Sequence, residues 1–484
     1  MTRNVEKLTK IIATIGPSSD SAEKIEELIR AGVNVFRFNF KHNTVDWHSE
    51  RIHRVTSVIQ KMGVFVGMLI DLQGPEIRIK MLSDNIKVTH GMRILLDEMS
   101  YIEKNTQITA ISITHPGIIA HLKQGQHVIA DDGSFEFTIE REGGKTYLVS
   151  KSDGILKTNK TLNIPGADFP FPTLIDRDFE GLKLARLREV DFVALSFVRS
   201  GLDVKILRQE MKKLGVDSKI VSKIETKKAI DCLDDIIKES DGIMVARGDL
   251  AVEAAYEQVP SLQKKIIKKC VEAGKFVITA TQMLESMIDH PYPTRAEVSD
   301  IANAVYDDTS AVMLSGETAT GLFSTEAVAI MSKTAAYNEC AFNVDLRYTH
   351  EYSLHGVDGI LCEAAYDLYH SSKLLKEHIK GFIVLTHTGR TPRLLSRYRP
   401  RLPLYTFCPS KKVASSLTIE FGVIPFVQDA RHISEQEVTG ENVRTAMHYL
   451  VKQGFATKGD SFIVLHGDRW AVTGGTSTVK IVTC

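Results

Sequence analysis

The chain has 484 residues, 43% of them hydrophobic and 25% charged, and its 60 basic and 60 acidic side chains give a formal net charge of zero. This length predicts about two or three domains, and the balanced charge gives no indication of a nucleic-acid or membrane partner. The six cysteines lack metal-ligand spacing, which is typical of reduced thiols. Because no apolar run approaches the ~20 residues of a membrane span and no signal peptide precedes the first expected strand, we expect a soluble, cytoplasmic protein.

Eight short apolar runs, most of them followed by a helical pattern, predict alternating strands and helices. The segment 21–32 is the clearest helix, with Ser21 as its N-cap and Gly32 as its stop. We expect another helix over 227–239, between the fifth and sixth runs. Eight such units are typical of a (β/α)8 TIM barrel. The runs occupy 11–16, 34–40, 65–72, 191–197, 219–225, 242–247, 276–282 and 311–316.

The interval between the third and fourth runs is long enough to hold an inserted domain. It contains short β-runs, and Asp132-Gly133 and Gly143-Gly144 are hairpin-type turns, so we predict a small antiparallel β-barrel lid. A lid inserted at the catalytic end of a barrel can close over a substrate. Later βα-like units predict an α/β domain with a mixed sheet. The predicted domains are a barrel over 1–74 and 167–341, the lid over 75–166, and a C-terminal regulatory domain over 342–484.

Polar side chains gather at the carboxyl ends of the predicted strands, where barrel enzymes carry their catalytic groups. One such residue alone is more simply a salt bridge at the barrel rim, but twelve converging on one rim indicate a site. Since side chains alternate along a strand, Arg37, Asn39 and Lys41 share one face of theirs, as Lys223 and Glu225 do of another. The twelve are Arg37, Asn39, Lys41, Asp71, Ser196, Lys223, Glu225, Arg247, Asp249, Thr281, Ser315 and Glu317.

These residue types favour phosphoryl transfer between small molecules. Glu225 and Asp249 supply two carboxylates from adjacent strands, which suit a Mg²⁺ ion that takes its other ligands from water and substrate. Arg37 and Lys223 supply positive charge for a phosphoryl group. The run 246–249, between a strand end and a helical turn, offers backbone N–H groups to a carboxylate. The pattern therefore predicts a small phosphorylated acid as substrate.

Longer blocks of the sequence resemble the signature sequences of the pyruvate kinase family, and the resemblance covers essentially the full chain. It implies transfer of a phosphoryl group from phosphoenolpyruvate to ADP, giving pyruvate and ATP, with Mg²⁺ or Mn²⁺ as cofactor, K⁺ as a second cation and a homotetrameric assembly. The blocks are TIGPSS (14–19), RFNFKH (37–42), GPEIR (74–78), NIPG (163–166), SKIE (222–225), GIMVARGDL (242–250), ATQMLESM (280–287), PTRAEVSDIANAV (293–305), MLSGET (313–318) and HTGRTPRLLSRYRP (387–400).

The resemblance also implies a role for individual residues. Arg37 and Lys223 would bind the phosphoryl group, with Lys223 stabilising the transition state, and Glu225 and Asp249 would hold Mg²⁺. The substrate carboxylate would bind the backbone of Gly248 and Asp249 together with Thr281, and the enolate carbon would be protonated by way of Thr281 or Ser315. A monovalent cation would bind Asn39, Asp71 and the backbone of Leu72. The residues implied at the nucleotide are Thr14, Pro17, His42, Arg78 and Lys160.

At several positions the chain departs from the family pattern. Lys41 stands where most relatives carry a serine whose hydroxyl binds K⁺, so our hypothesis is that the Lys41 ammonium replaces the ion. The alternative is that Lys41 points to solvent. Leu72-Gln73 replaces the commoner Thr-Lys, and Asp308 replaces a customary glycine. Three alanines, at 251, 254 and 255, depart from a Gly-x-Glu-x-Pro pattern, which we expect to affect packing rather than ligands.

In the last predicted domain, a loop between a strand and a helix is a candidate anion site. The resemblance implies that it binds a phosphorylated allosteric effector, while a purely structural loop is the alternative. We expect no appended phosphotransfer-type tail. Two competing functions are a Mg²⁺-dependent lyase or aldolase acting on pyruvate enolates, which leaves the lid and Lys223 unexplained, and an inactive regulatory relative. The loop comprises Thr386, His387, Thr388, Gly389, Arg390 and Thr391.

Overall fold

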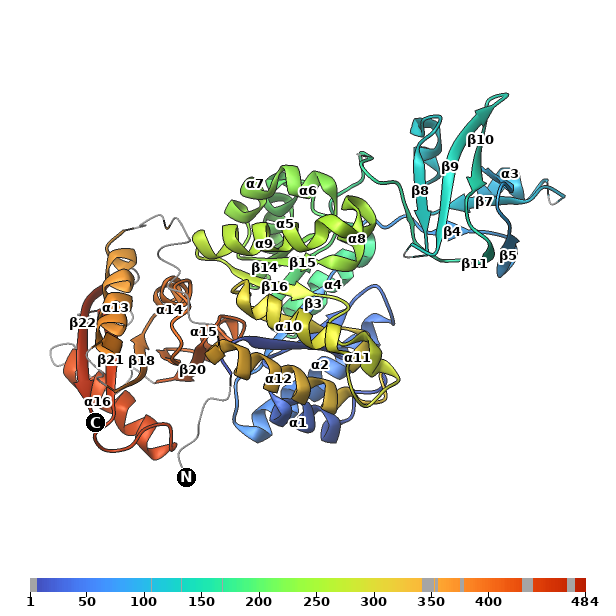
Figure 1. Cartoon of the computed structure of the whole chain (residues 1–484). Helices are drawn as coiled ribbons and strands as arrows, with labels where there is room; N and C mark the ends of the chain where they lie inside the picture. The colour runs from blue at the N-terminus through green and yellow to red at the C-terminus, as the bar shows by residue number, and fades with distance from the viewer. Residues whose placement is uncertain are drawn as a thin grey trace.

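The computed structural model shows a central barrel with one further body at either end (Figure 1). The lid projects beyond one end of the barrel, and the C-terminal domain packs at the opposite end. No helix in the described part of the chain is both long enough and apolar enough to cross a membrane. The structure describes residues 7–105, 107–131, 133–167, 169–341, 352, 356–374, 378–428, 438–467 and 475–484.

The described residues form a closed barrel of eight parallel strands in the order β1-β17-β16-β15-β14-β13-β3-β2. Each of the eight predicted apolar runs supplies one strand, so the predicted (β/α)8 barrel is confirmed. The strands are β1 (Lys10–Thr14), β2 (Val35–Asn39), β3 (Gly67–Asp71), β13 (Phe192–Leu195), β14 (Lys219–Ile224), β15 (Gly242–Ala246), β16 (Phe276–Ala280) and β17 (Ala311–Leu314).

Helices surround the barrel, and the first of them begins and ends as predicted. The Ser21 hydroxyl accepts a hydrogen bond from the Lys24 backbone N–H, and Gly32 ends the helix with a positive φ. The single helix expected over 227–239 is instead two helices that meet at Cys232. The helices of this domain are α1 (Ala22–Ala31), α2 (Val45–Met62), α4 (Asp176–Leu187), α5 (Gly201–Leu214), α6 (Lys227–Asp231), α7 (Leu233–Glu239), α8 (Arg247–Ala254), α9 (Val259–Glu272), α10 (Arg295–Tyr306), α11 (Gly316–Ala319) and α12 (Ser324–Ala341), with 3₁₀ turns at Tyr256–Gln258 and Glu285–Ile288.

The barrel interior is apolar towards the strand starts and polar towards the strand ends. On β2 the inward side chains are Val35 and then Arg37, while Phe36 and Phe38 pack outward beneath the helices. Strands β3 and β14 repeat this order, with Leu69 followed by Asp71 and Val221 followed by Lys223. The alternation therefore brings the polar residues of separate strands together at one end of the barrel.

The insertion is a small β-domain, with some differences from the prediction. Its described residues form a seven-stranded sheet, in the order β12-β8-β9-β10-β6-β7-β4, and a two-stranded sheet of β11 and β5. Gly143 and Gly144 make the predicted turn, both at positive φ, whereas Asp132 lies outside the described residues. Strands β6 and β7 pair in parallel, which the expected antiparallel pattern lacks. The elements are β4 (Ile79–Lys80), β5 (Asn85–Val88), β6 (Arg93–Leu96), α3 (Met99–Ile102), β7 (Ala110–Ile113), a 3₁₀ turn (Pro116–His121), β8 (His127–Ala130), β9 (Phe135–Glu142), β10 (Lys145–Ser150), β11 (Gly154–Lys157) and β12 (Leu162–Asn163).

The C-terminal domain is built on a mixed sheet, as expected, which over the described residues runs β20-β19-β18-β21-β22 with β22 antiparallel to β21. It is hydrogen-bonded to the starts of the barrel strands: Lys10 Nζ donates to the Val423 carbonyl at 2.7 Å, and Lys412 Nζ donates to the Val190 carbonyl at 3.0 Å. The elements are α13 (Gly356–Leu374), β18 (Ile379–Leu385), α14 (Arg390–Ser396), β19 (Leu404–Cys408), α15 (Lys411–Ser416), β20 (Val423–Val427), α16 (Val438–Lys452), β21 (Ser461–Gly467) and β22 (Thr476–Thr483).

Candidate active site

A network of buried charges occupies the polar end of the barrel interior. Arg37 Nε donates to Asp71 Oδ2 at 2.8 Å, and its Nη1 donates to the Thr14 hydroxyl at 3.0 Å. Lys223 Nζ lies 3.3 Å from Asp71 Oδ1 and 2.8 Å from Glu225 Oε1. The side chains of Arg37, Asp71, Lys223 and Glu225 are each at most 8% exposed. Four of the twelve predicted rim residues are thus in direct contact.

Asp71 is the shared partner of the two cations. Burial alone raises the pKa of Asp71, but the charges of Lys223 and Arg37 outweigh burial and hold that pKa below its ordinary value. Ser196, another predicted rim residue, accepts a hydrogen bond from Lys223 Nζ at 2.8 Å and donates to the Leu72 carbonyl at 2.7 Å. The Lys223 ammonium is therefore fixed by three residues from three strands or strand ends.

Asp249 lies next to this network, where its charge and that of Glu225 repel each other. Glu225 is fully buried, its Oε2 accepts the Phe197 N–H at 2.7 Å, and its Oε1 forms an ion pair with Lys223 Nζ at 2.8 Å. Burial and the nearby Glu225 charge raise the pKa of Asp249 to about 6. A divalent cation between the two carboxylates would remove this repulsion, so the residues fit the predicted metal.

The described residues contain no group of three or more His, Cys, Asp or Glu side chains that could hold a metal on their own. A Mg²⁺ ion that keeps several waters and takes oxygens from a substrate needs only one or two carboxylates from the protein. This chemistry is that of a hard cation rather than of zinc or a redox metal.

Lys41 remains inside the site instead of pointing to solvent. Its Nζ donates to Glu76 Oε1 at 2.8 Å, lies 5.2 Å from the Phe197 ring centre, and belongs to a side chain that is 14% exposed. Its backbone N–H donates to Asn39 Oδ1 at 3.3 Å. The opposite oxygen of Glu76 accepts from Arg78 Nε at 2.8 Å. Sequence reasoning placed Lys41 on the face of Arg37 and Asn39 but did not identify Glu76 as its partner.

Thr281 and Gly248 meet as predicted for a carboxylate cradle, although the Gly248 N–H is not free. It donates to Thr281 Oγ1 at 2.9 Å, and Thr281 Oγ1 donates to the Ala280 carbonyl at 2.6 Å. Thr281 has a φ of 68°, a conformation that costs a β-branched residue about 1–3 kcal/mol. The buried Ser315 hydroxyl has no hydrogen-bond partner in the described part of the chain. Strain and an unpaired hydroxyl are both typical of a functional site.

Arg247 and Glu317 were counted at the rim, but their contacts are structural. Arg247 donates to Asp300 Oδ1 at 2.7 Å and to the Thr281 carbonyl at 2.6 Å, which supports the strained backbone there. Glu317 is fully buried and accepts the backbone N–H groups of Leu284 at 3.0 Å and Ser315 at 2.7 Å. Both residues therefore position the ends of β16 and β17.

The five residues expected at the nucleotide fall into smaller groups. Thr14 belongs to the Arg37 network, and Pro17 is exposed in the loop after β1. Arg78 Nη1 donates to the Asn159 carbonyl at 2.8 Å, beside Lys160, whose Nζ pairs with Asp131 at 2.6 Å. His42 is exposed directly after Lys41. Arg78, Lys160 and His42 lie near the junction between the barrel and the lid.

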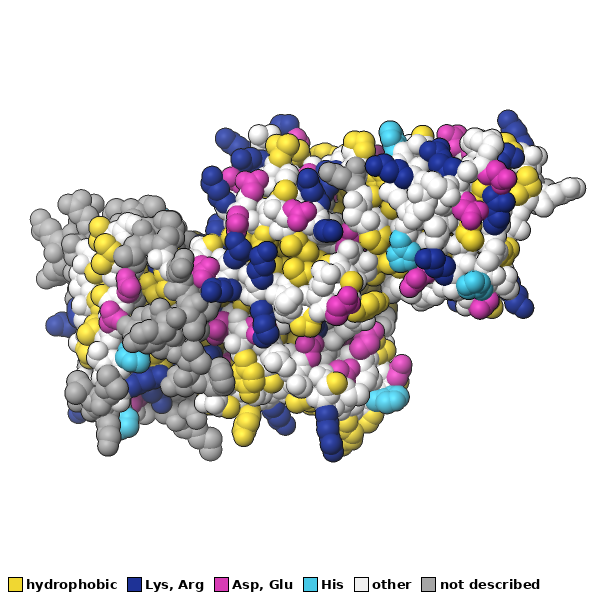
Figure 2. Space-filling model, turned by 45° about the horizontal axis from the view of Figure 1, so that its top comes forward, with side chains coloured by type: hydrophobic (Ala, Val, Ile, Leu, Met, Phe, Trp, Pro, Cys, Tyr) yellow, Lys and Arg dark blue, Asp and Glu magenta, His cyan; other side chains and the backbone are white. Residues whose placement is uncertain are grey.

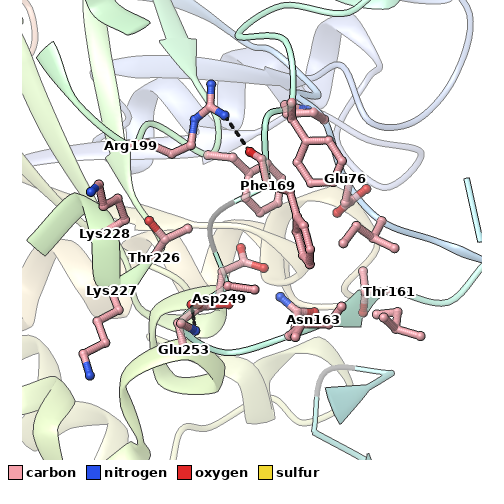
Figure 3. Close-up of a pocket in the computed structure, with 18 of the residues that line it drawn as sticks. Glu76, Thr161, Asn163, Phe169, Arg199, Thr226, Lys227, Lys228, Asp249 and Glu253 are labelled. Carbon is pink, nitrogen blue, oxygen red and sulfur yellow. Dashed lines mark hydrogen bonds between the residues drawn. The ribbon is translucent and has the colours of Figure 1, made fainter. Parts of the chain in front are cut away.

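A cavity of about 360 Å³ lies between the lid and the barrel, and Asp249 lines it (Figure 3). Glu253 lies one turn after Asp249 on α8, and its Oε2 accepts the Gly166 N–H from the lid linker at 3.3 Å. In Figure 3, Arg199 donates to the Phe169 carbonyl, at 3.1 Å, along one wall. Sequence reasoning missed these lining residues, although the i,i+4 spacing of Asp249 and Glu253 was a usable signal.

The candidate effector loop follows β18 and leads into α14. The Thr386 hydroxyl accepts the Gly389 N–H at 3.1 Å, and Gly389 has a φ of 81°, which closes a tight turn. Arg390 forms an ion pair with Asp358 on α13. The Thr391 hydroxyl lies 2.8 Å from that of Thr476. Residues 468–474, which connect β21 and β22, lie outside the described residues.

Comparisons with known proteins agree with this geometry. The family model described as "Pyruvate kinase, barrel domain" matches residues 6–328, and "Pyruvate kinase, alpha/beta domain" matches residues 365–482. The chain belongs to the pyruvate kinase family. The pyruvate kinase of Clostridium perfringens (strain 13 / Type A) is 38% identical over 479 residues, which cover 98% of this chain and 99% of the relative.

Other members of the pyruvate kinase family give the same result. The pyruvate kinase of Staphylococcus epidermidis (strain ATCC 12228 / FDA PCI 1200) is 36% identical over 477 residues, covering 98% of this chain and 80% of the relative. That of Staphylococcus aureus (strain MRSA252) is 37% identical over 482 residues with the same coverage. The predicted family is confirmed, and the lyase or aldolase alternative has no support.

Proposed function

We propose that the chain transfers the phosphoryl group of phosphoenolpyruvate to ADP, producing pyruvate and ATP. The single observation that carries this proposal is the buried cluster of Arg37, Lys223 and Asp71 beside the mutually repelling carboxylates of Glu225 and Asp249. The cluster lies in the part of the chain that matches the pyruvate kinase barrel domain. The bond between phosphorus and the enol oxygen breaks, a bond to a terminal oxygen of ADP forms, and the enolate carbon takes a proton.

Glu225 and Asp249 would hold a Mg²⁺ or Mn²⁺ ion. When bound, the cation supplies positive charge to the oxygens of the phosphoryl group and of the enolate. The protein contributes two carboxylates in fixed positions, since Glu225 is anchored by the Phe197 N–H and Asp249 sits in the first turn of α8. The repulsion from Glu225 that helps to raise the pKa of Asp249 supports this assignment.

The chain's own residues account for binding and proton transfer. The Lys223 ammonium would bind the transferring phosphoryl group and stabilise its transition state, and Arg37 would hold the same group from the opposite strand. The substrate carboxylate would replace Thr281 as the acceptor for the Gly248 N–H and would also meet the backbone of Asp249. A proton reaches the enolate carbon through the Thr281 or Ser315 hydroxyl, of which Ser315 is unpaired in the described structure.

The nucleotide would enter between the barrel and the lid. We assign its contacts to Thr14, Pro17, His42, Arg78 and Lys160. The positions of Arg78 and Lys160 at the lid entrance support this, because closing the lid would carry their charges over the phosphates.

We propose that Lys41 replaces the monovalent cation electrostatically. Asn39, Asp71 and the Leu72 carbonyl would otherwise hold K⁺. The Lys41 side chain is largely buried and bound to Glu76, so a positive charge is permanently present near this set. The ammonium does not need to occupy the ion's position for the charge to have the same effect on the phosphoryl group.

The remaining assignments concern regulation and assembly. We propose that the loop 386–391 binds a phosphorylated effector, that the protein is a cytoplasmic homotetramer, and that the domain limits are those expected from the sequence. The exposed Thr388 and the Arg390 guanidinium at the mouth of this loop support the effector assignment.

An assay of the purified chain with phosphoenolpyruvate and ADP tests the proposed reaction. We expect pyruvate and ATP in equal amounts with Mg²⁺, and loss of both products when a chelator removes the cation. Pyruvate formed without ATP would indicate a hydrolase or lyase, and absence of both products would contradict the proposal.

A further inference from the structure

A second cavity, of about 630 Å³, lies where the C-terminal domain meets the starts of the barrel strands. Figure 2 shows Lys and Arg side chains on the barrel face beside the C-terminal domain. The barrel side of this cavity contributes Lys219, Asp241 and Lys275. The C-terminal side contributes three residues of the candidate effector loop and α14, namely Thr388, Arg390 and Arg393.

The carboxylates near this junction cavity already have arginine partners. Asp241 Oδ2 accepts from Arg208 Nη2 at 3.1 Å, and Glu420 Oε1 accepts from Arg393 Nε at 2.9 Å. Arg390 pairs with Asp358. Asp241, Glu420 and Asp358 are therefore already paired with arginines and form no ion pair with Lys219 or Lys275 in the described structure.

Lys219 and Lys275 are left with uncompensated charge. In the described part of the chain neither lysine forms an ion pair, and Lys275 Nζ donates only to the Ser240 carbonyl, at 2.6 Å. Burial lowers the pKa of Lys275, and the like charges of Arg208 and Arg393 lower it further, against the opposing effect of Asp241. Cations crowded in a partly buried cavity are an arrangement that an anion stabilises.

We propose that this junction cavity binds a small phosphorylated anion that Lys219 and Lys275 of the barrel contact together with Thr388 and Arg390 of the C-terminal domain. The inference rests on the proposed effector role of the loop and extends it to the barrel. Lysines supply point charges, the guanidinium supplies a planar donor pair, and the threonine hydroxyl donates to a phosphoryl oxygen. A sugar phosphate, a nucleoside monophosphate and free phosphate share this chemistry.

The position of the two lysines connects the junction cavity to the active site. Lys219 is the first residue of β14, which contains Lys223 and ends one residue before Glu225. Lys275 directly precedes β16, which ends one residue before Thr281. An anion held by both domains would restrain these two strands at their starts. Because such coupling is reciprocal, ligand at the active site would change anion affinity by the same factor.

Calorimetric titration of the full chain tests the site, using inorganic phosphate, glucose 6-phosphate and AMP as probes. The double variant Lys219→Gln/Lys275→Gln and the single variant Arg390→Gln should each bind the tightest probe about tenfold more weakly or worse, as expected for a lost charged contact. Lys61→Gln is the matched control, because Lys61 is an exposed lysine on α2, and it should bind as the wild type does. Lys219→Gln alone serves if the double variant folds poorly.

The possible outcomes distinguish a site shared by both domains from an effector loop that binds the anion alone. Wild-type affinity in the barrel variants with loss in Arg390→Gln overturns the two-domain site and leaves the effector loop intact. No binding of any probe overturns both. Turnover measured without a probe should be the same in the double variant as in the wild type. If the proposed reaction is wrong, the wild type itself will show no turnover, which is a different result from a loss of probe binding.

Discussion

The ammonium of Lys41 stays charged within the active site. Burial lowers its pKa, but the carboxylates of Asp249, Glu76 and Glu225 together outweigh burial and raise that pKa above its ordinary value. A lysine whose pKa is raised in this way carries its proton at neutral pH. The residue therefore provides a fixed positive charge close to Asp249, Glu76 and Glu225.

Turnover should consequently be insensitive to K⁺. We expect wild-type activity to be retained when a bulky organic cation replaces K⁺ at constant ionic strength, whereas Lys41→Ser should lose most of its activity unless K⁺ is present. Lys61→Ser is a matched control that removes an exposed lysine far from the site. A collapse of wild-type turnover without K⁺ would exclude the role given to Lys41.

Asp308 shows why glycine is customary at its position. Its φ is 68°, a left-handed conformation that favours glycine, and its side chain is buried between the barrel and the C-terminal domain. Oδ1 has no hydrogen-bond donor among the described residues and lies 3.5 Å from Arg401 Nη2, while the backbone carbonyl accepts from Arg399. Burial raises the pKa of Asp308 to about 6, although Arg399 and Arg401 oppose the rise.

This pKa predicts a pH-dependent stability. The folded state binds the Asp308 proton more tightly than the unfolded state, whose pKa is about 4, so stability falls as pH rises from about 4 to 6. The shift corresponds to a loss of up to about 3 kcal/mol at pH values above 6. Asp308→Asn should remove this dependence, and Asp308→Gly should raise the Tm at neutral pH by also relieving the backbone.

The test is to measure the Tm of the wild type and of each variant by calorimetry between pH 4 and 8. The difference in Tm between variant and wild type at each pH removes the contribution of the other carboxylates, which titrate in both proteins. Identical pH profiles for the wild type and Asp308→Asn would show that Asp308 does not titrate in this range.

At the scale of secondary structure, the strands were predictable because their apolar runs end in charged residues. Seven of the eight barrel strands lie within the predicted runs, β1 begins one residue before its run, and the period-two alternation correctly assigned Phe36 and Phe38 to the helix side. The break at Cys232 was not predictable, since the apolar spacing that defines α6 continues into α7. Local periodicity determines which residues face the core but does not detect a single residue that leaves helical geometry.

The contacts between elements were less accessible to sequence reasoning. Alternation placed Lys223 and Glu225 together, and the structure brings their charged atoms to 2.8 Å. The pairing of Lys41 with Glu76, across 35 positions of the chain, depends on how the lid linker leaves β3. The same holds for Glu253 and Gly166, because a contact between the lid and the barrel depends on how two domains dock.

At the scale of the whole molecule, the barrel separates two tasks along its axis. Its strand ends carry the charges proposed for phosphoryl transfer and face the lid, whereas its strand starts are bonded to the C-terminal domain (Figure 1). Strand β14 runs from the junction cavity to Lys223, so a single element connects both ends.

The most direct test of the proposed reaction compares the wild type with Lys223→Met, a variant of similar length without the charge. Turnover of phosphoenolpyruvate and ADP should fall by at least about a hundredfold, because the charge that stabilises the transferring phosphoryl group is lost. Mn²⁺ binding, measured by paramagnetic resonance, should persist because Glu225 and Asp249 remain, and Lys223→Arg should recover the Tm if Met destabilises the buried network. Wild-type turnover in a folded Lys223→Met variant would contradict the account.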